Sequence, residues 1–387
     1  MLFTHRWLTS NDRRVLDRIS QMRHDLRYFV IQEPRRWSGL LARMTRARAL
    51  RASNSIEDIN VSAEDALAIV DNEEATEADK ATVQAVQGYH NAMDFVLQRC
   101  KTEHFHFSED FILAIHFMIC QHDMSANPGN YRKGWVGVRN TRSGEIVHEG
   151  VDREKLEPLM LELVDYMNDP LVESSVLKGA MAHLNLTMLN PFSDGNGRTA
   201  RCLQSAVFAD KGILAPVFSS IEEYIGHNQQ EYYDVLAETG GGGWYPERDC
   251  TQWVRYCITG HYRQAQTLLR RTQEFSRLYD ELLGILEKAD LPARSALGLL
   301  QAAVGGKVRN SSYRVSADIS NNLASRDLKG LVDAGFLLAE GEKRGRQYVA
   351  SPEILELRRK TRLPKPIDNP FEDAAIIGPT QKSLFDG

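Results

Sequence analysis

A segment of twelve residues near the middle of the chain combines the groups that a polyphosphate site requires. It runs from Asn190 to Arg201 and reads NPFSDGNGRTAR. Gly195 and Gly197 can adopt positive φ and leave room for a ligand to approach the backbone. The amide N–H groups at the start of the following helix lack intrahelical partners, and together with the helix dipole they favour an anion. Arg198 and Arg201 are spaced so that both can face the same phosphate region from the first helical turn.

The same segment offers one candidate metal ligand, because Asp194 is its only carboxylate. Carboxylate oxygens are preferred ligands of Mg²⁺, which in such sites also binds phosphate oxygens of the substrate. Two arginines, a nest of amides and a carboxylate therefore predict binding of a nucleotide polyphosphate with Mg²⁺. The alternative interpretation is a glycine-rich helix connector with solvated arginines.

Helices and a hairpin must position this loop. Apolar residues recur at helical spacing in several stretches, and they predict helices at 153–167, 175–189, 199–211 and 253–287. Two β-prone runs, 135–138 and 145–148, flank a turn that contains Gly144 and predict a hairpin. The expected fold is therefore mainly α-helical around the loop.

From about residue 299 the pattern changes to shorter elements. The predicted elements are helices at 316–323 and 325–334, then strands near 336–338 and 347–349. This order is typical of a winged helix-turn-helix domain, which places its recognition helix in the major groove of DNA. The candidate DNA contacts are basic residues of the second helix and the wing, namely Arg326, Lys329, Lys343 and Arg344. Winged helices also dock proteins, so both partners stay open.

The composition of the chain limits the compartment and the partners that we expect for the protein. The chain has 387 residues and a formal net charge of -5, which gives no reason to expect a polyanion-binding surface over its whole length. Its five cysteines show no CxxC spacing, so we expect buried thiols in a reducing compartment. The amino terminus lacks a signal-peptide pattern, and no apolar run reaches the roughly 20 residues that span a bilayer. We expect a cytoplasmic protein with no membrane partner.

The loop resembles the HPFxDGNGRxxR motif of the Fic family and differs from it at the first position, where Asn190 replaces histidine. The likeness extends to stretches outside the loop. Residues 182–184 (AHL) resemble the family's approach helix, 129–132 (GNYR) with the hairpin resemble its flap, and 53–57 (SNSIE) resemble its (S/T)xxxE inhibitory motif. The resemblance implies a helical Fic core with a β-hairpin flap, for which a carboxyl-terminal winged helix is a frequent companion.

Members of this family transfer AMP from ATP to a hydroxyl group on a protein, and the resemblance assigns roles accordingly. Asp194 would hold Mg²⁺ on the α- and β-phosphates. Asn196 and Arg198 would bind phosphate, and Arg201 would take the γ-phosphate. The flap would pin the target segment through residues that include Val136, Val138, Val147 and His148.

The resemblance also implies an inhibitory role for Ser53 and Glu57. Glu57 would pair with Arg201 and keep the γ-phosphate out of its productive position. The next residue is Asp58, where the family usually has glycine or asparagine.

Asn190 separates nucleotide binding from chemistry. A hydroxyl that attacks the α-phosphate must lose a proton, which histidine can accept at neutral pH and an asparagine amide cannot. Loss of a general base typically costs about 10²–10⁴-fold in rate, whereas binding depends on the rest of the loop. Among other histidines, His148 on the flap is the first substitute to consider, while His183 is interpreted as structural and His116 as a packing residue.

Three functions remain open. The first is an AMP-transferase slowed or silenced by Asn190. The second is a nucleotide-sensing pseudoenzyme whose bound state is relayed to DNA by the winged helix. The third is a hydrolase that removes AMP from a modified target with water activated by Glu57. A homodimer is also considered.

The expected domain organisation follows these motifs. The predicted regions are an amino-terminal helical region with the inhibitory motif (1–100), the Fic core (101–235), a helical connector (236–295), the winged helix (296–360) and a flexible tail (361–387).

Overall fold

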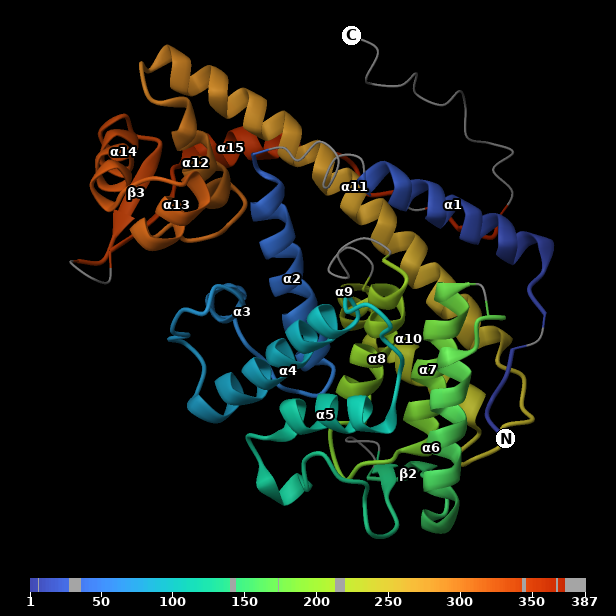
Figure 1. The fold of residues 1–387 in the computed structure, drawn as a ribbon. Helices are drawn as coiled ribbons and strands as arrows, with labels where there is room; N and C mark the ends of the chain where they lie inside the picture. The colour runs from blue at the N-terminus through green and yellow to red at the C-terminus, as the bar shows by residue number, and fades with distance from the viewer. Residues whose placement is uncertain are drawn as a thin grey trace.

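The structure is a computed structural model, and it describes residues 1–5, 7–27, 36–139, 144–172, 174–212, 220–342, 346–366 and 368–372. The described residues are mainly helical, as the sequence predicts, with two short antiparallel hairpins (Figure 1). The helices of the body are α1 (Ser10–Arg27), α2 (Ser38–Ser55), α3 (Ala63–Val70), α4 (Lys80–Arg99), α5 (Glu109–Cys120), α6 (Arg153–Asn168), α7 (Ser175–Leu189), α8 (Asn196–Asp210), α9 (Glu222–His227), α10 (Gln229–Gly240) and α11 (Thr251–Lys288). The first hairpin consists of β1 (Gly137–Arg139) and β2 (Ile146–Glu149). The carboxyl-terminal part contains α12 (Ala296–Ala303), α13 (Asn310–Ala317), α14 (Asn321–Asp333), β3 (Leu337–Glu340), β4 (Gln347–Ala350) and α15 (Pro352–Thr361).

Helix α7 lies at the centre of the body and ends at the candidate loop. It has the bounds that the sequence predicts, and it begins at Ser174, whose Oγ accepts a hydrogen bond from the amide of Leu177 at 3.3 Å. Nearly all of its side chains are buried, because α6, α8 and α11 pack around it. On the α11 side, Trp253 donates from Nε1 to the carbonyl of Ala180 at 2.8 Å. The loop therefore follows directly from a helix that is largely buried.

Helix α8 begins earlier than predicted. The sequence predicts a start at residue 199, but the helix starts at Asn196, directly after Gly195. Gly195 has φ +77°, and its carbonyl already accepts the amide of Thr199 at 2.9 Å. A glycine in the left-handed region can turn the chain and cap the helix at once. Gly195 therefore ends the loop, and Gly197 lies in the first turn of α8.

Helix α11 connects the two ends of the molecule. It is one helix of 38 residues, where the sequence left one or two open. Figure 1 shows it running from the body to the carboxyl-terminal part. Its first half packs Trp253 and Tyr256 into one core, and its second half packs Phe275 and Leu282 into another. This helix fills the predicted connector region.

The carboxyl-terminal part contains α12, α13 and α14, then the hairpin of β3 and β4, and then α15. The predicted bounds of the paired helices were wrong, because the helix predicted at 316–323 lies at Asn310–Ala317 and the helix predicted at 325–334 begins at Asn321. Asp318 adopts the left-handed conformation with φ 53°, and Ser320 then caps α14 by accepting the amide of Leu323 at 3.4 Å. In the hairpin Leu337 pairs with Ala350 and Glu340 with Gln347.

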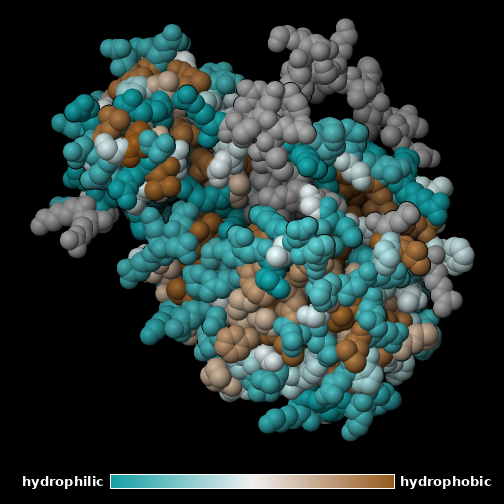
Figure 2. Space-filling model, viewed as in Figure 1, coloured by the Kyte–Doolittle hydropathy of each residue, from teal (hydrophilic) through white to brown (hydrophobic). Residues whose placement is uncertain are grey.

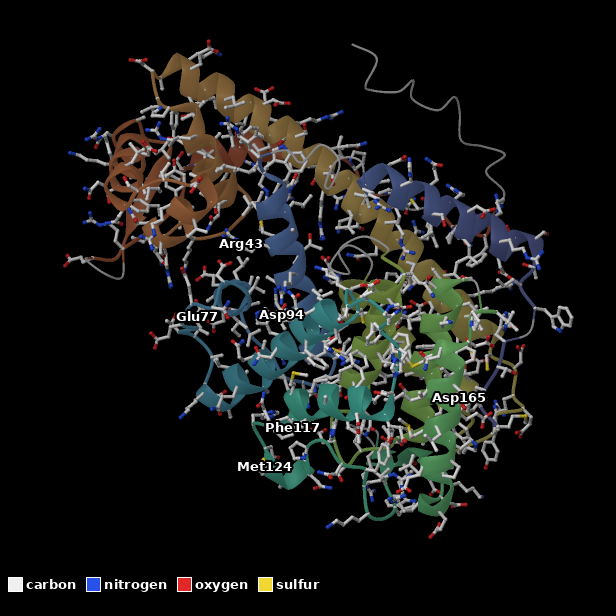
Figure 3. All side chains as sticks on the ribbon, in the orientation of Figure 1. Arg43, Glu77, Asp94, Phe117, Met124 and Asp165 are labelled. Atoms are coloured by element: carbon white, nitrogen blue, oxygen red, sulfur yellow. The ribbon has the colours of Figure 1, made fainter. Side chains whose placement is uncertain are left out.

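Ion pairs join this part to the amino-terminal region. Lys307 lies 2.5 Å from a carboxylate oxygen of Glu64 on α3, and Arg309 lies 3.2 Å from Glu73. Arg43, labelled on α2 in Figure 3, donates to Gln301 of α12 at 2.9 Å. Two basic residues ahead of α13 are therefore neutralised by acids of the same chain.

Part of the expected flexible tail contacts the body. Asp368 accepts hydrogen bonds from Tyr262 at 2.7 Å and from Gln266 at 2.9 Å, and the ring of Phe371 lies 5.6 Å from the guanidinium carbon of Arg255. Residues 373–387 lie outside the described part of the chain.

The surface and the cysteines fit the composition. Figure 2 shows hydrophobic residues in separate groups on a largely hydrophilic face. No helix among the described residues is both long and apolar enough to cross a bilayer. All five cysteines are buried free thiols, as expected.

Candidate nucleotide-binding site

Asn190 is the residue that ends α7 and begins the loop. Its backbone is left-handed (φ 50°, ψ 58°), and its amide donates to the carbonyl of Leu186 at 3.0 Å. Asparagine and histidine are both enriched in this conformation, so either can occupy the position without strain. The side chain is 3% exposed and lies beside Gly150, where an added Cβ would come within 3.1 Å of the Asn190 Cβ. Asn190 thus stands where the candidate base is expected, between the loop and the flap.

Arg132 ties the flap to the loop. This buried guanidinium donates from Nε to the carbonyl of Asn190 at 2.8 Å and from Nη1 to Gly134 at 2.6 Å. Its Nη2 donates to the carbonyl of Val151, and its own amide donates to Pro191 at 2.9 Å. The sequence placed Arg132 in the flap motif but did not predict this role. The signal available there was only its position at the end of the GNYR stretch.

His116 on α5 braces the loop from the other side. Its Nδ1 accepts the amide of Gly129 at 3.0 Å, which leaves Nε2 to donate to the carbonyl of Asp194 at 3.1 Å. The ring stacks on Phe192 with centroids 3.7 Å apart. Burial lowers the pKa of His116 to about 4, so the ring is neutral near pH 7. His116 is a packing residue, as predicted, and its two hydrogen bonds also fix the loop.

Asn196 holds the loop together from within. Its Oδ1 accepts the amide of Phe192 and its Nδ2 donates to the carbonyl of Phe192, both at 2.9 Å. The resemblance assigns a phosphate contact to Asn196, whereas the structure directs its side chain to the loop backbone. The amide supplies a reciprocal clamp around residues 192–196.

Arg198 and Asp194 form an ion pair in the candidate site. Arg198 is 2% exposed and donates from Nη2 to an Asp194 carboxylate oxygen at 3.1 Å. Its Nε and Nη1 are buried and have no hydrogen-bond partner within the described chain. Buried polar groups are normally satisfied, and two free N–H groups here suit an anion. The Asp194 side chain is 63% exposed and so can reach a cation in solvent.

The fit to Mg²⁺ depends on this single carboxylate. Among the described residues no group of three or more histidine, cysteine, aspartate or glutamate side chains could hold a metal ion by itself. Mg²⁺ is commonly held by one or two carboxylates together with substrate phosphates. The donor set therefore fits Mg²⁺ that arrives with a nucleotide.

Arg201 is occupied by the end of α2. Its Nε donates to Ser53 Oγ at 2.8 Å, and its Nη2 donates to the Ser53 carbonyl at 2.9 Å and to Glu57 Oε1 at 2.8 Å. Burial alone would lower the pKa of Arg201, but the Glu57 carboxylate raises it above the usual value. Its Nη1 has no partner among the residues that the structure describes. Arg201 is thus charged and only partly satisfied.

Glu57 also covers the first turn of α8. A Cβ built on Gly197 would lie 2.3 Å from Glu57 Oε1 and 3.2 Å from Arg201 Nη1. The helix amides that could bind an anion therefore lie directly under the Glu57 carboxylate. Glycine at position 197 is what permits this close approach.

The end of α2 is itself fixed. The carbonyl of Ile56 accepts hydrogen bonds from Gln229 and from the hydroxyl of Tyr233, both at 2.9 Å. Asp58 follows with φ 58°, a left-handed position where glycine or asparagine is common and aspartate is tolerated. The unusual aspartate after Glu57 is therefore compatible with the turn.

A model of the Fic/DOC family matches residues 106–207. The chain carries a Fic/DOC domain. It is 27% identical over 184 residues to a protein adenylyltransferase Fic of Nematostella vectensis, and 31% identical over 158 residues to the protein adenylyltransferase fic-1 of Caenorhabditis elegans. These matches cover 44% and 40% of this chain but 39% and 27% of the two relatives.

Solved structures share the fold. A Fic family protein from Desulfovibrio desulfuricans superposes with a TM-score of 0.58 at 19% identity, covering 90% of this chain and 98% of that one. Fic-1 from Caenorhabditis elegans superposes with a TM-score of 0.54 at 22% identity, covering 67% of this chain and 72% of that one. The first likeness extends well beyond the Fic/DOC domain.

The flap of the Fic/DOC domain presents an apolar surface beside the loop. In the hairpin Gly137 pairs with Glu149 and Val138 with His148, with an irregularity before Arg139. Val138 is 38% and Val147 is 37% exposed, and Val136 is half-buried. Two of the valines for which the resemblance implies a target contact are therefore exposed to solvent.

His148 is not placed to replace the missing histidine. It is buried rather than on the surface, and its Nε2 donates to the carbonyl of Met188 at 2.8 Å. Its Nδ1 is enclosed near Gly240, and burial lowers its pKa. His183 is enclosed as well, between Gln204 at 2.7 Å and Tyr232 at 3.0 Å, in keeping with a structural role.

The candidate DNA-binding residues lie apart from the Fic/DOC domain. Arg326 and Lys329 are both exposed on α14, the second of the paired helices. Lys343 and Arg344 lie outside the described residues.

Proposed function

We propose that this chain binds ATP with Mg²⁺ and is an AMP-transfer scaffold whose transfer step is impeded by Asn190 and gated by Glu57. The carrying observation is the pair of buried arginines at the start of α8. Arg198 keeps two free N–H groups and Arg201 keeps one, within the part of the chain that is described. Three free charge-assisted donors beside helix amides and an exposed carboxylate suit a polyphosphate.

Each residue has a distinct part in this proposal. Arg198 and the first amides of α8 bind phosphate oxygens, and Asp194 holds Mg²⁺, which neutralises the charge on the phosphates. Arg201 takes the terminal phosphate once Glu57 moves away. Asn190 can orient an incoming hydroxyl by hydrogen bonding but cannot accept its proton.

The protein partner is a target segment that carries a hydroxyl group. We place it along the two-stranded hairpin, which has an unpaired strand edge among the described residues and two exposed valines, and which lies beside Asn190 at Gly150. Extended peptides add to such edges through main-chain hydrogen bonds. The proposal rests on the relatives' names, protein adenylyltransferase, and on this edge.

The test is labelling with α-labelled ATP and Mg²⁺ in a host lysate. Four proteins are compared: the chain itself, Asn190→His, Glu57→Gly and the double variant. Label transfer by the variants with histidine at 190, strongest in the double variant, supports the proposal. Equal labelling by the unchanged chain shows that Asn190 does not limit transfer. Absence of labelling by the double variant, with ATP binding intact, argues against transfer chemistry.

A second candidate function is nucleotide sensing, and α2 favours it. At its first turns, Trp37, Leu40 and Leu41 belong to the core shared with α11 and α12. At its last turn, Ser53 contacts Arg201. The single helix α2 thus contacts both the carboxyl-terminal part and the nucleotide site. Nucleotide binding that shifts α2 would therefore change the packing of the carboxyl-terminal part.

Sensing has its own test. Binding of the full chain to a labelled random-sequence DNA duplex is measured at low salt, with and without ATP and Mg²⁺. A change of severalfold in affinity on nucleotide addition, lost in Arg326→Gln, supports a sensor that acts through DNA. DNA binding that is absent, or unaffected by nucleotide, excludes that mode.

A further inference from the structure

The carboxyl-terminal part meets α3 and the loop after it through charged side chains (Figure 1). Lys307 lies 2.5 Å from a carboxylate oxygen of Glu64. Glu73 has two partners, because its Oε2 accepts from Arg309 Nη1 at 3.2 Å and its Oε1 accepts from Ser311 Oγ at 3.0 Å. All three partners of these acids lie between the end of α12 and the first turn of α13.

The two acids are carried by one unit of the chain, which consists of residues 63–78 and which we call the α3 unit. The buried carboxylate of Asp65 accepts hydrogen bonds from the amide of Thr76 at 2.8 Å and from that of Ala78 at 2.7 Å, so it ties the loop to the helix. The side chain of Leu67 packs against the core of the body and also against the core that contains α12 and α14. The α3 unit is therefore held as one piece between the two parts.

The residues under the α3 unit adjoin the start of α14. Asn310 stands between Arg309 and Ser311 in the sequence, and its Nδ2 donates to Ser325 Oγ at 2.8 Å and to the carbonyl of Asn321 at 3.3 Å. In a helix-turn-helix domain the second helix contacts base edges with its amino-terminal residues, while the first helix crosses the backbone of the DNA. Helices α13 and α14 are the paired helices of the predicted winged helix. The acids of the α3 unit thus bind the chain where a DNA backbone would pass.

The contacts of the α3 unit are of a kind that a polyanion can displace. The side chains of Lys307 and Arg309 are 30% and 39% exposed, and ion pairs with such exposure contribute little to stability. Each lysine or arginine that neutralises a phosphate of duplex DNA releases a condensed counterion, which favours binding at low salt. Phosphates of a duplex can therefore compete with the two carboxylates.

We propose that Lys307, Arg309 and Ser311 form a contact surface for the phosphate backbone of duplex DNA, and that the α3 unit is an autoinhibitory cover on this surface. The inference rests on the second candidate function, in which the carboxyl-terminal part binds DNA. Glu57 precedes Glu64 by seven residues, so one short stretch of chain supplies an acid to the nucleotide site and begins the cover. Displacement of Glu57 by a nucleotide therefore also loosens the cover.

The test is fluorescence anisotropy of a labelled random-sequence duplex, titrated with the full chain at low salt and without nucleotide. Glu73→Gln is compared with Glu74→Gln, which removes the same charge from the neighbouring, exposed position. We expect Glu73→Gln to tighten DNA binding about fivefold or more, because it frees Arg309 for a phosphate, and Glu74→Gln to change it less than about twofold. The slope of log affinity against log salt should steepen by about one phosphate contact in Glu73→Gln alone.

Arg309→Gln shows whether the carboxylate acts through this pairing. In the unchanged chain Arg309 is engaged by Glu73, so the substitution should change the affinity for DNA less than about twofold. In the Glu73→Gln background the same substitution should remove most of the gained affinity. Arg314→Gln is the matched control, because Arg314 is exposed on α13 and its substitution should have equal effects in the two backgrounds.

Other results overturn the proposal. Equal tightening by Glu73→Gln and Glu74→Gln reduces the effect to general surface charge. DNA binding that neither variant changes leaves the sensing function intact and removes the cover. Absence of DNA binding in every variant, Glu73→Gln included, removes the DNA-binding function and the cover with it.

Amide hydrogen exchange on the unchanged chain keeps the test independent of variant folding. Bound duplex DNA should slow exchange in the first turn of α13 and speed exchange in α3. Protection of α14 alone, with exchange in α3 unchanged, contradicts displacement of the α3 unit.

Discussion

The carboxylate of Glu57 lies 2.8 Å from Nη2 of Arg201 and rests directly on Gly197, so one side chain covers both the cation and the helix amides of the site. An acid at the amino terminus of α8 occupies the place that an anion would take. The contact satisfies one nitrogen of a buried guanidinium. Under the proposed function, the same interaction would also exclude a competing phosphate and so inhibit the site.

Removing the Glu57 charge should open the site. We expect Glu57→Gln to tighten binding of ATP with Mg²⁺ about tenfold or more, because the phosphate no longer competes with a charge-assisted hydrogen bond. Calorimetric titration measures the effect. Asp58→Asn is the matched control, since it removes a neighbouring charge and tolerates the left-handed backbone. Equal tightening by both variants would assign the effect to general electrostatics instead of the pairing with Arg201.

Much of the site could be predicted because its signals are local. The bounds of α7, the hairpin and the glycine–arginine loop follow from spacing and residue type along a few turns of chain. The pairing of Glu57 with Arg201 came from a resemblance and joins positions far apart in sequence, which no local pattern encodes. The hydrogen bonds between Arg201 and Ser53 were not predicted.

Other features were not predicted because the same residue type can either bind a ligand or hydrogen-bond to the backbone of its own chain. Asn196 looks like a ligand-binding amide in sequence, yet its nearest partners are the backbone groups of Phe192. Arg132 was predicted only as part of the flap motif, and tertiary packing buries its guanidinium against the carbonyls of three residues. The start of α8 was misplaced because glycines were taken as loop, although Gly195 caps a helix.

Arg132 should contribute strongly to stability. Its guanidinium donates to three carbonyls that hold the flap and the loop together, and truncation leaves these acceptors buried without a donor. We expect Arg132→Ala to lower the free energy of unfolding by about 2–4 kcal/mol. Urea denaturation measures it, with exposed Lys133→Ala as a control expected within about 0.5 kcal/mol. A similar loss in the two variants would show that the bridge is not the cause.

Stability should fall between about pH 6.5 and pH 4 because of His116. Burial lowers its folded pKa to about 4, while the unfolded value is about 6.5. In this window the unfolded chain binds the proton and the folded chain does not, so the free energy of unfolding decreases as the pH falls. The stabilisation is fully present above pH 6.5 and amounts to about 3 kcal/mol at most.

The contribution of His116 can be isolated by comparing how steeply the free energy of unfolding depends on pH in different variants. His183 and His90 are shifted in the same direction by burial, to pKa values of about 3 and about 4, so the whole chain shows a summed effect. Urea unfolding at several pH values should give His116→Gln a slope reduced by about one proton. His104→Asn is the control, because His104 is 90% exposed and left-handed. An unchanged slope in His116→Gln would mean that His116 does not titrate as described.

Gly195 should tolerate no side chain. It combines φ +77° with close packing, since a Cβ would lie 2.5 Å from Cys120 Sγ. Gly335 has the same φ, but a Cβ added there would meet nothing within 4 Å, so it isolates backbone strain from the clash. We expect Gly335→Ala to cost about 1 kcal/mol of unfolding free energy, and Gly195→Ala about 1–3 kcal/mol more. Chemical denaturation of both variants decides the matter. If the two lose the same stability, the contact with Cys120 adds nothing, and the requirement for glycine at the start of α8 is one of backbone conformation alone.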